Sequence, residues 1–151
     1  MLDLSGMLEH LLSRAESWVP GASRTLITQG RPAADCRLLA VWVERVDAGI
    51  GGTLVKTACM IEPRATFHVT YWGCTPTQEG RAAPTAAAIT DNALDFADVG
   101  DAIWSGIVED WAGKNLVEGA NCGTIDLSQG MSVLDPQGGL AGWEATIIVT
   151  L

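Results

Sequence analysis

Hydrophobic and polar residues alternate most regularly at the C-terminus of the chain. The odd-numbered positions are mostly large and apolar, with Trp143, Ala145, Ile147, Val149 and Leu151. The even-numbered positions between them are Glu144, Thr146, Ile148 and Thr150. A period of two is typical of a β-strand whose two faces have different surroundings. A Gly-Gly turn signal precedes this strand, and residues 123–135 alternate before the turn. We therefore expect a C-terminal β-hairpin whose last strand is paired inside a sheet.

Helical periodicity marks two other segments. From Asp3 to Trp18, apolar residues recur every three or four positions, and a proline–glycine pair follows as a stop signal. The second segment, the longest periodic one in the chain, begins at Pro84 and Thr85 and ends at Gly113. Both patterns predict amphipathic helices.

Two glycines lie inside the longer predicted helix. Gly100 and Gly106 each cost about 1 kcal/mol relative to alanine at an interior helical position. Close packing of the helix onto a sheet is the expected reason, with a kink as the alternative. Asp91, Asp95 and Asp98 lie one turn apart on the polar face of this helix.

Two further segments have the alternation of strands. The first runs from Arg37 to Val46; the second, Val55 to Cys74, fits one long strand or two shorter ones, with Pro63 at a break or an edge. For residues 21–35 the pattern is weak, and we expect a loop or an irregular short strand. The order of elements predicts a single α+β domain over residues 1–151. We expect a mostly antiparallel β-sheet packed against one long helix, with an N-terminal helix and the C-terminal β-hairpin.

The composition is apolar for a chain of 151 residues. Hydrophobic residues make up 48% of the chain, charged residues make up 18%, and there are six tryptophans. Globular domains usually carry about 25% charged residues. This surplus of apolar surface predicts either a generously filled core or extensive contacts between subunits.

The net charge of −9 arises in one half of the sequence. Residues 1–81 carry eight basic and eight acidic side chains, whereas residues 82–151 carry ten acids and a single base, Lys114. A groove that holds phosphates needs clustered Lys and Arg, which argues against tight nucleic-acid binding. An acidic half can keep the protein in solution, or it can repel DNA along a channel without holding it.

Catalytic and metal-binding signatures are missing from the sequence. Cys36, Cys59, Cys74 and Cys122 form no C-x-x-C pair, and the N-terminus has no signal-peptide pattern. We therefore expect a protein made in the cytoplasm, with four free thiols and no zinc. His68 is expected to be a structural residue of a strand face. We expect neither enzymatic activity nor a cofactor, and no stretch approaches the roughly 20 apolar residues that span a bilayer.

Three segments resemble the tail terminator proteins of long-tailed bacteriophages, especially those of phages that infect actinobacteria. The segments are the helix end Ile103–Val108, the turn Gly138–Trp143 and the apolar strand that ends the chain. The order of elements is also similar across nearly the whole length. These are packing patterns and not catalytic signatures.

The resemblance implies a structural protein of the virion. Such proteins form a ring, usually a homohexamer, that caps the tube of major tail protein once the tail has reached its length. The ring then joins the tube to a head-completion or stopper protein at the tail–neck junction. Genomic DNA passes through the centre without specific binding, and no membrane is involved.

Two sets of charged residues are candidates for such a ring. The lumen candidates are the strand and turn acids Asp126, Asp135 and Glu144, because the sheets of this family tend to face inward. The candidates for contact between subunits are Asp91, Asp95 and Asp98, facing Arg14, Arg24, Arg37 or Arg45 of the next subunit. Ring subunits meet through two different faces, and a neutral half and an acidic half supply complementary charge.

Two other functions fit the same residues. One is another phage neck protein, a stopper or a head–tail connector, which is also a ring of similar size. The other is a cellular binding module whose acidic face meets a basic partner protein. Gene order separates them, because a terminator gene lies just before that of the major tail protein.

Overall fold

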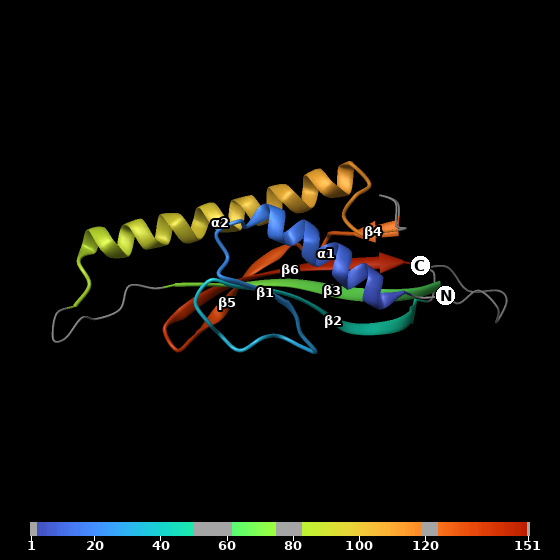
Figure 1. Cartoon of the computed structure of the whole chain (residues 1–151), viewed down its shortest axis with the longest axis horizontal. Coiled ribbons are helices and arrows are strands. Elements are labelled where there is room, and N and C mark those ends of the chain that lie inside the picture. The colour runs from blue at the N-terminus through green and yellow to red at the C-terminus, as the bar shows by residue number, and fades with distance from the viewer. Residues whose placement is uncertain (1–2, 50–61, 75–82, 119–123, 151) are drawn as a thin grey trace.

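The computed structural model describes residues 3–49, 62–74, 83–118 and 124–150. Helices α1 (Leu4–Trp18) and α2 (Ala86–Ala112) lie on one face of a sheet (Figure 1). The described strands are β1 (Arg24–Ile27), β2 (Leu38–Gly49), β3 (Glu62–Gly73), β4 (Ile125–Asp126), β5 (Met131–Gln137) and β6 (Leu140–Thr150). The predicted α+β class is confirmed, together with both helices and the C-terminal hairpin.

The sheet is antiparallel except at one edge. Its order is β1-β2-β3-β6, and β4 and β5 both pair with the remaining edge of β6. β1 runs parallel to β2, so the weakly patterned segment 21–35 contains a short strand. The predicted strand within Val55–Cys74 begins at Glu62, and residues 55–61 lie outside the described ranges.

Residues 28–37, which connect β1 to β2, form a segment that we call the strap. It runs on the side of the sheet opposite to the helices (Figure 1). The indole Nε1 of Trp72 on β3 donates a hydrogen bond to the carbonyl of Pro32 at 3.3 Å. Both residues are buried, and Trp72 has no exposed surface. The strap therefore covers a face that simple alternation would leave open to water.

The core lies between the sheet and the two helices. On β6 the side chains of Ala145, Ile147 and Val149 are fully buried, as the alternation predicts. They share one hydrophobic cluster with Ile103 and Ile107 of α2. The outer end of this layer is an aromatic stack in which the rings of Trp143 and Phe96 lie 4.8 Å apart.

The two glycines of α2 permit close packing against different partners. A Cβ added at Gly100 would lie 2.5 Å from the indole of Trp143, so α2 approaches the sheet there, as expected. At Gly106 a Cβ would overlap the indole of Trp18, which belongs to α1. The second glycine thus serves the contact between the two helices, a partner that the sequence pattern did not predict.

Gly106→Ala is expected to lower the free energy of unfolding by about 1–3 kcal/mol, as overpacking does, despite the better helix propensity of alanine. The Trp18 indole cannot swing away freely, because its Nε1 donates to Asp110 at 2.8 Å. Urea denaturation measures the change. Ser105→Ala, at the neighbouring exposed position, is the control and should stay within about 0.5 kcal/mol of the wild type. A Gly106→Ala variant that is more stable than the wild type would show that the Trp18 indole moves aside to accommodate the added methyl group.

The structure differs from the expectation of free thiols at two of the four cysteines. Cys36 and Cys74 form a disulfide, with Cα atoms 4.7 Å apart. The register of β2 and β3 pairs Leu38 with Trp72, so the two cysteines face each other just beyond this pair of strands. Sequence spacing cannot reveal that juxtaposition, because it depends on the strand register. Cys59 and Cys122 lie outside the described residues.

Candidate functional site

The N-terminal half of α2 extends beyond the sheet (Figure 1). Thr85 begins the helix, and its hydroxyl accepts a hydrogen bond from the backbone N–H of Ala88 at 3.1 Å. Residues 86–91 are all exposed, and the first buried residue of α2 is Gly100. We call residues 86–98 the arm.

Two large apolar side chains of the arm are open to solvent. Ile89 is 53% exposed and Leu94 is 60% exposed. Isolated exposed apolar residues are ordinary, but these two share a helical segment with exposed alanines at positions 86–88, 93 and 97. Exposed apolar side chains gathered on one helical segment make it a candidate for contact with another molecule.

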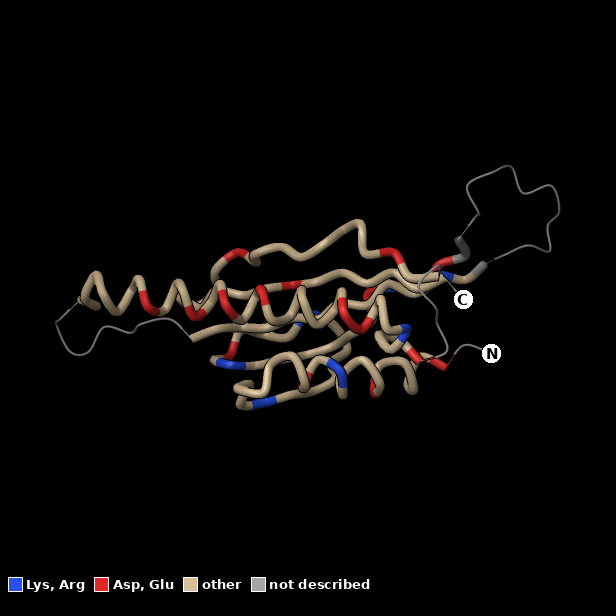
Figure 2. The backbone as a smooth tube through the Cα atoms, turned by 90° about the horizontal axis from the view of Figure 1, so that it is seen from above, with Lys and Arg blue, Asp and Glu red and all other residues tan. Residues whose placement is uncertain are grey.

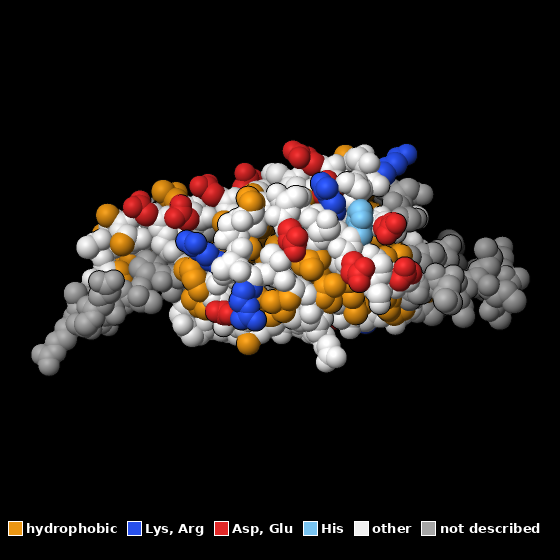
Figure 3. Space-filling model, viewed as in Figure 1, with side chains coloured by type: hydrophobic (Ala, Val, Ile, Leu, Met, Phe, Trp, Pro, Cys, Tyr) orange, Lys and Arg blue, Asp and Glu red, His pale blue; other side chains and the backbone are white. Residues whose placement is uncertain are grey.

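The arm also collects the three predicted interface acids. Asp91, Asp95 and Asp98 are exposed, and α2 contains no Lys or Arg. Figure 2 shows the acidic positions following one another along α2, and Figure 3 shows apolar side chains near its projecting end. Within the described ranges, no ion pair involves these three carboxylates. The arm is therefore an acidic surface interrupted by apolar residues.

Most of the predicted basic partners are already paired within the chain. Arg14 forms an ion pair with Asp110 at 2.9 Å, and Arg24 forms one with Asp35 at 3.0 Å. Arg45 lies 3.4 Å from a carboxylate oxygen of Asp47. Those contacts compete with any contact to a neighbouring subunit.

Arg37 is the basic candidate that the structure places beside the arm. Its backbone φ is 58°, in the left-handed region, and within the described part of the chain it makes no ion pair. Arg37 lines a groove of about 460 Å³ together with Asp95, Asp98 and the apolar side chains of Trp18, Val19 and Val99. The groove thus has charges of both signs at its rim.

Tyr71 also lines this groove. Burial raises the pKa of its phenol, and the positive charge of Arg37 lowers it by less, so the net pKa lies above the ordinary value. Tyr71 therefore stays protonated at neutral pH.

Two of the predicted lumen acids lie at one edge of the sheet. Asp126 on β4 and Asp135 on β5 are exposed, and both strands pair with β6. Hydrogen bonds from the side chain and the backbone of Ser128 lower the pKa of Asp126; the backbone N–H of Ser128 lies 2.7 Å from the carboxylate. Asp126 is therefore ionised at neutral pH.

The third predicted lumen acid, Glu144, is not a free surface charge, and the expectation for it is wrong. Its side chain is only 7% exposed, and Arg31 of the strap binds both carboxylate oxygens, at 2.6 and 2.8 Å. The hydroxyl of Thr70 donates to the same carboxylate at 3.0 Å. Alternation correctly places Glu144 opposite to the core, but the strap covers that face.

The pKa of Glu144 reflects two opposing effects. Burial raises it, whereas hydrogen bonds from Arg31 and Thr70, together with the nearby charges of His68 and Arg31, lower it by more. The net pKa therefore lies below the ordinary value of 4.5. Glu144 stays ionised and holds Arg31, so this ion pair fastens the strap to the sheet.

His68 completes a polar layer on the same face. Its ring stacks on that of Trp42 at 4.4 Å, its Nε2 lies 2.6 Å from a carboxylate oxygen of Glu44, and its Nδ1 lies 3.2 Å from the hydroxyl of Thr146. The indole of Trp42 in turn donates to Thr70 at 3.0 Å. The structural role expected of His68 agrees with these contacts, whereas its partners were not predicted.

An imidazole between carboxylates can serve acid–base chemistry. In this layer, however, the Thr70 hydroxyl is fully buried and already donates to Glu144. His68 itself is only 6% exposed. The layer thus contacts the strap through the bonds of Glu144 to Arg31.

Glu144→Gln is expected to lower the free energy of unfolding at pH 7 by about 1–2 kcal/mol, somewhat less than the roughly 1.5–3 kcal/mol of a hydrogen bond to a charged group. The expected loss of stability is small because Arg31 is half exposed, so water solvates its guanidinium in the variant. Since the folded pKa of Glu144 is lowered, its charge stabilises the wild type above pH 4.5, and this contribution is lost as the pH falls below that value. Urea titrations at pH 7 and pH 3 should show the difference between the two proteins shrinking. Asp135→Asn is the control at an exposed acid of β5; a difference for Glu144→Gln that is constant with pH would contradict the ion-pair explanation.

The described residues contain no group of three or more His, Cys, Asp or Glu side chains arranged to hold a metal ion. No helix in the described ranges is long and apolar enough to cross a membrane. The chain matches no model of a known protein family, and no protein of curated function is similar to it in sequence.

Proposed function

We propose that this chain is a structural subunit of a ring at the neck of a long-tailed phage, where it terminates the tail tube and joins it to the head connector. The observation that carries the proposal is the arm, which projects past the sheet and exposes Ile89 and Leu94. A neighbouring subunit would bury this surface. The resemblance of Ile103–Val108, Gly138–Trp143 and the last strand to tail terminators supports the same function.

A ring needs two different contact faces on each subunit. The arm supplies an acidic and apolar face. The groove beside it carries Arg37, whose charge is unpaired within the described ranges. Contact of the projecting residues 86–91 of one arm with the groove of the next subunit, which Asp95 and Asp98 also line, would bring Asp91 toward Arg37 around apolar side chains.

The acids at the sheet edge fit a DNA channel. Asp126 and Asp135 are exposed and carry charge of the same sign as DNA. A wall of this kind repels phosphates and lets the duplex slide. Under the proposal, these two residues face the lumen of the ring.

Gene deletion tests the terminator function. Removing the gene from a phage genome that carries it should give tails of uncontrolled length that fail to join heads, as seen by electron microscopy. Tails of normal length that fail to join heads would overturn the proposal and favour a stopper or connector. Fully normal virions would exclude any function at the neck.

Complementation of the deletion tests the arm. The wild-type gene should restore tail length, whereas the double variant Ile89→Asp/Leu94→Asp should fail, because charge in a buried contact is costly. Val133→Asp is a matched control, since Val133 is 56% exposed and lies on β5. Full rescue by the arm variant would remove the arm from the subunit contact.

Charge reversal tests the lumen residues. Asp126→Lys/Asp135→Lys should allow particles to assemble but slow DNA ejection about tenfold, because lysines on the wall hold phosphates. Ejection kinetics at several salt concentrations measure the effect, which should weaken as salt rises. Failed assembly with unchanged ejection from the remaining particles would move both residues to a protein contact.

A further inference from the structure

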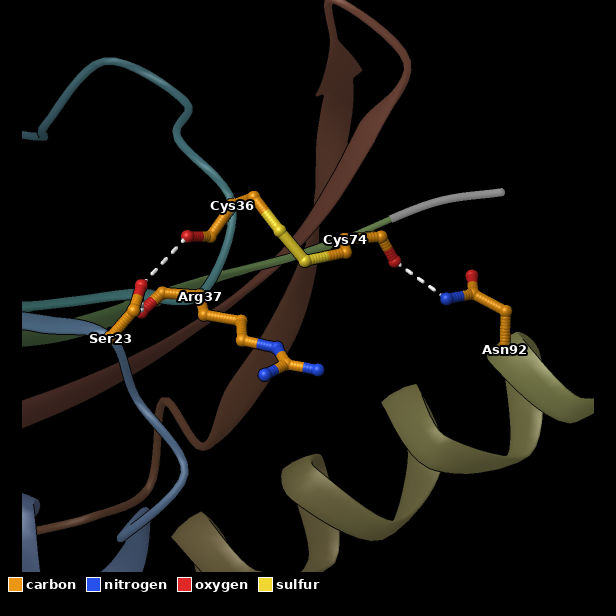
Figure 4. Close-up of a disulfide and its surroundings, with 5 residues drawn as sticks. All are labelled: Ser23, Cys36, Arg37, Cys74 and Asn92. Carbon is orange, nitrogen blue, oxygen red and sulfur yellow. Dashed lines mark hydrogen bonds between the residues drawn. A yellow bond between two sulfur atoms is a disulfide. The ribbon is translucent and has the colours of Figure 1, made fainter. Parts of the chain in front are cut away.

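The Cys36–Cys74 disulfide lies where three parts of the fold meet (Figure 4). Cys36 belongs to the end of the strap, and Cys74 follows β3. The amide of Asn92 on the arm donates to the carbonyl of Cys74 at 2.6 Å, and the hydroxyl of Ser23 donates to the carbonyl of Cys36 at 3.2 Å. The disulfide thus links the end of the strap to the end of β3, where the arm makes its Asn92 hydrogen bond.

Both sulfur-bearing residues are within reach of small molecules. Cys36 is exposed and Cys74 is partly exposed, unlike the fully buried Trp72 two residues before it. Exposed disulfides exchange with small thiols more readily than buried ones do.

We propose that Cys36 and Cys74 form a reversible redox site that fastens the strap to the end of β3. In a reducing cytoplasm the pair is a dithiol. In oxidising surroundings it reacts with a low-molecular-weight disulfide such as oxidised glutathione. This site is independent of the proposed ring function, because it operates within one chain.

The exchange proceeds in two balanced steps. One cysteine thiolate attacks a sulfur of oxidised glutathione, which forms a mixed disulfide and releases one glutathione thiolate. The second cysteine thiolate attacks the protein sulfur of that mixed disulfide, which forms the Cys36–Cys74 bond and releases the second glutathione thiolate. The protein loses two electrons and two protons, and one oxidised glutathione becomes two reduced molecules.

The dithiol state should loosen the end of the strap. Without the covalent link, this end keeps the hydrogen bond from the Ser23 backbone N–H to the carbonyl of Arg37, at 2.9 Å. Such a non-covalent contact opens locally more often than a covalently closed segment does. The arm is held by the hydrogen bond of Asn92 and the stacking of Phe96 on Trp143 in both redox states, so it should not change.

A redox titration tests whether the pair is reversible. The protein carrying Cys59→Ser/Cys122→Ser, which leaves only this pair, is equilibrated in buffers with different ratios of reduced to oxidised glutathione. Thiols are then trapped and counted by mass spectrometry. We expect a dithiol at cytosol-like ratios and a disulfide at oxidising ratios. A pair that remains oxidised at cytosol-like ratios is a permanent structural disulfide and would overturn the proposal.

Hydrogen exchange tests whether the pair controls the strap. Amides in residues 28–38 should exchange at least about fivefold faster in the reduced protein, whereas residues 86–94 of the arm and 140–150 of β6 should be unaffected. Cys36→Ser should show the fast exchange in both buffers, and the reduced protein itself provides the comparison if that variant fails to fold. Equal exchange rates of the strap amides in the two redox states would show that the disulfide does not hold the strap in place.

Discussion

Ile147→Ala is expected to lower the free energy of unfolding by about 2–5 kcal/mol, the usual cost of truncating a large core side chain. Ile147 has no exposed surface and lies opposite Phe67 in the register of β3 and β6. It shares the hydrophobic cluster with Ile103 and Ile107 of α2, so truncation leaves a cavity between the sheet and the helix. Urea denaturation followed by tryptophan fluorescence measures the loss.

Val133→Ala provides a matched control for this experiment. Val133 lies on β5, the partner of β6 in the same hairpin, and it is 56% exposed. Its truncation should change the free energy of unfolding by less than about 0.5 kcal/mol. A cost of that small size at Ile147 would contradict the placement of this residue in the core.

Loss of the disulfide is expected to cost about 4 kcal/mol in the Cys36→Ser/Cys74→Ser variant. The two cysteines are separated by 38 positions. The chain-entropy model gives about 3 kcal/mol for a 15-residue loop and about 4.7 for a 100-residue loop, and this loop lies between them. Thermal or urea denaturation of the variant and of the oxidised wild type measures the difference.

Two controls separate the cross-link from the side chains. The reduced wild type should resemble the double variant, because both lack the bond. Cys59→Ser leaves this cross-link in place and should retain the stability of the oxidised wild type. Equal stability of oxidised and reduced wild type would show that the bond contributes no net constraint.

Periodicity was sufficient to predict the elements that bury one face. Ile147 and Val149 alternate with more polar positions, and Ile103 and Ile107 recur at helical spacing. Each of these patterns indicates which face of its element is buried. The two helices, the long antiparallel strands and the C-terminal hairpin follow from such local patterns. The short parallel strand β1 was only half predicted, because four residues carry too few alternations to distinguish a strand from a loop.

The missing parts of the prediction depend on contacts between distant residues. Glu144 has the sequence pattern of a surface acid, and only the position of Arg31, 113 residues earlier, makes it an internal ion-pair partner. The disulfide requires the register of β2 and β3, and the exposed arm requires knowledge of where the sheet beneath α2 ends. None of these three features can be predicted from the periodicity of a short segment.

The position of β6 has a consequence for synthesis of the chain on the ribosome. β6 is translated after the other described strands, yet it lies inside the sheet, between β3 and the pair β4 and β5. Until residues 140–150 have emerged, one edge of β3 has no partner and presents open backbone hydrogen-bonding groups. Such an edge invites pairing with other nascent chains. Vectorial folding therefore leaves this protein most prone to aggregation just before its last described strand is released.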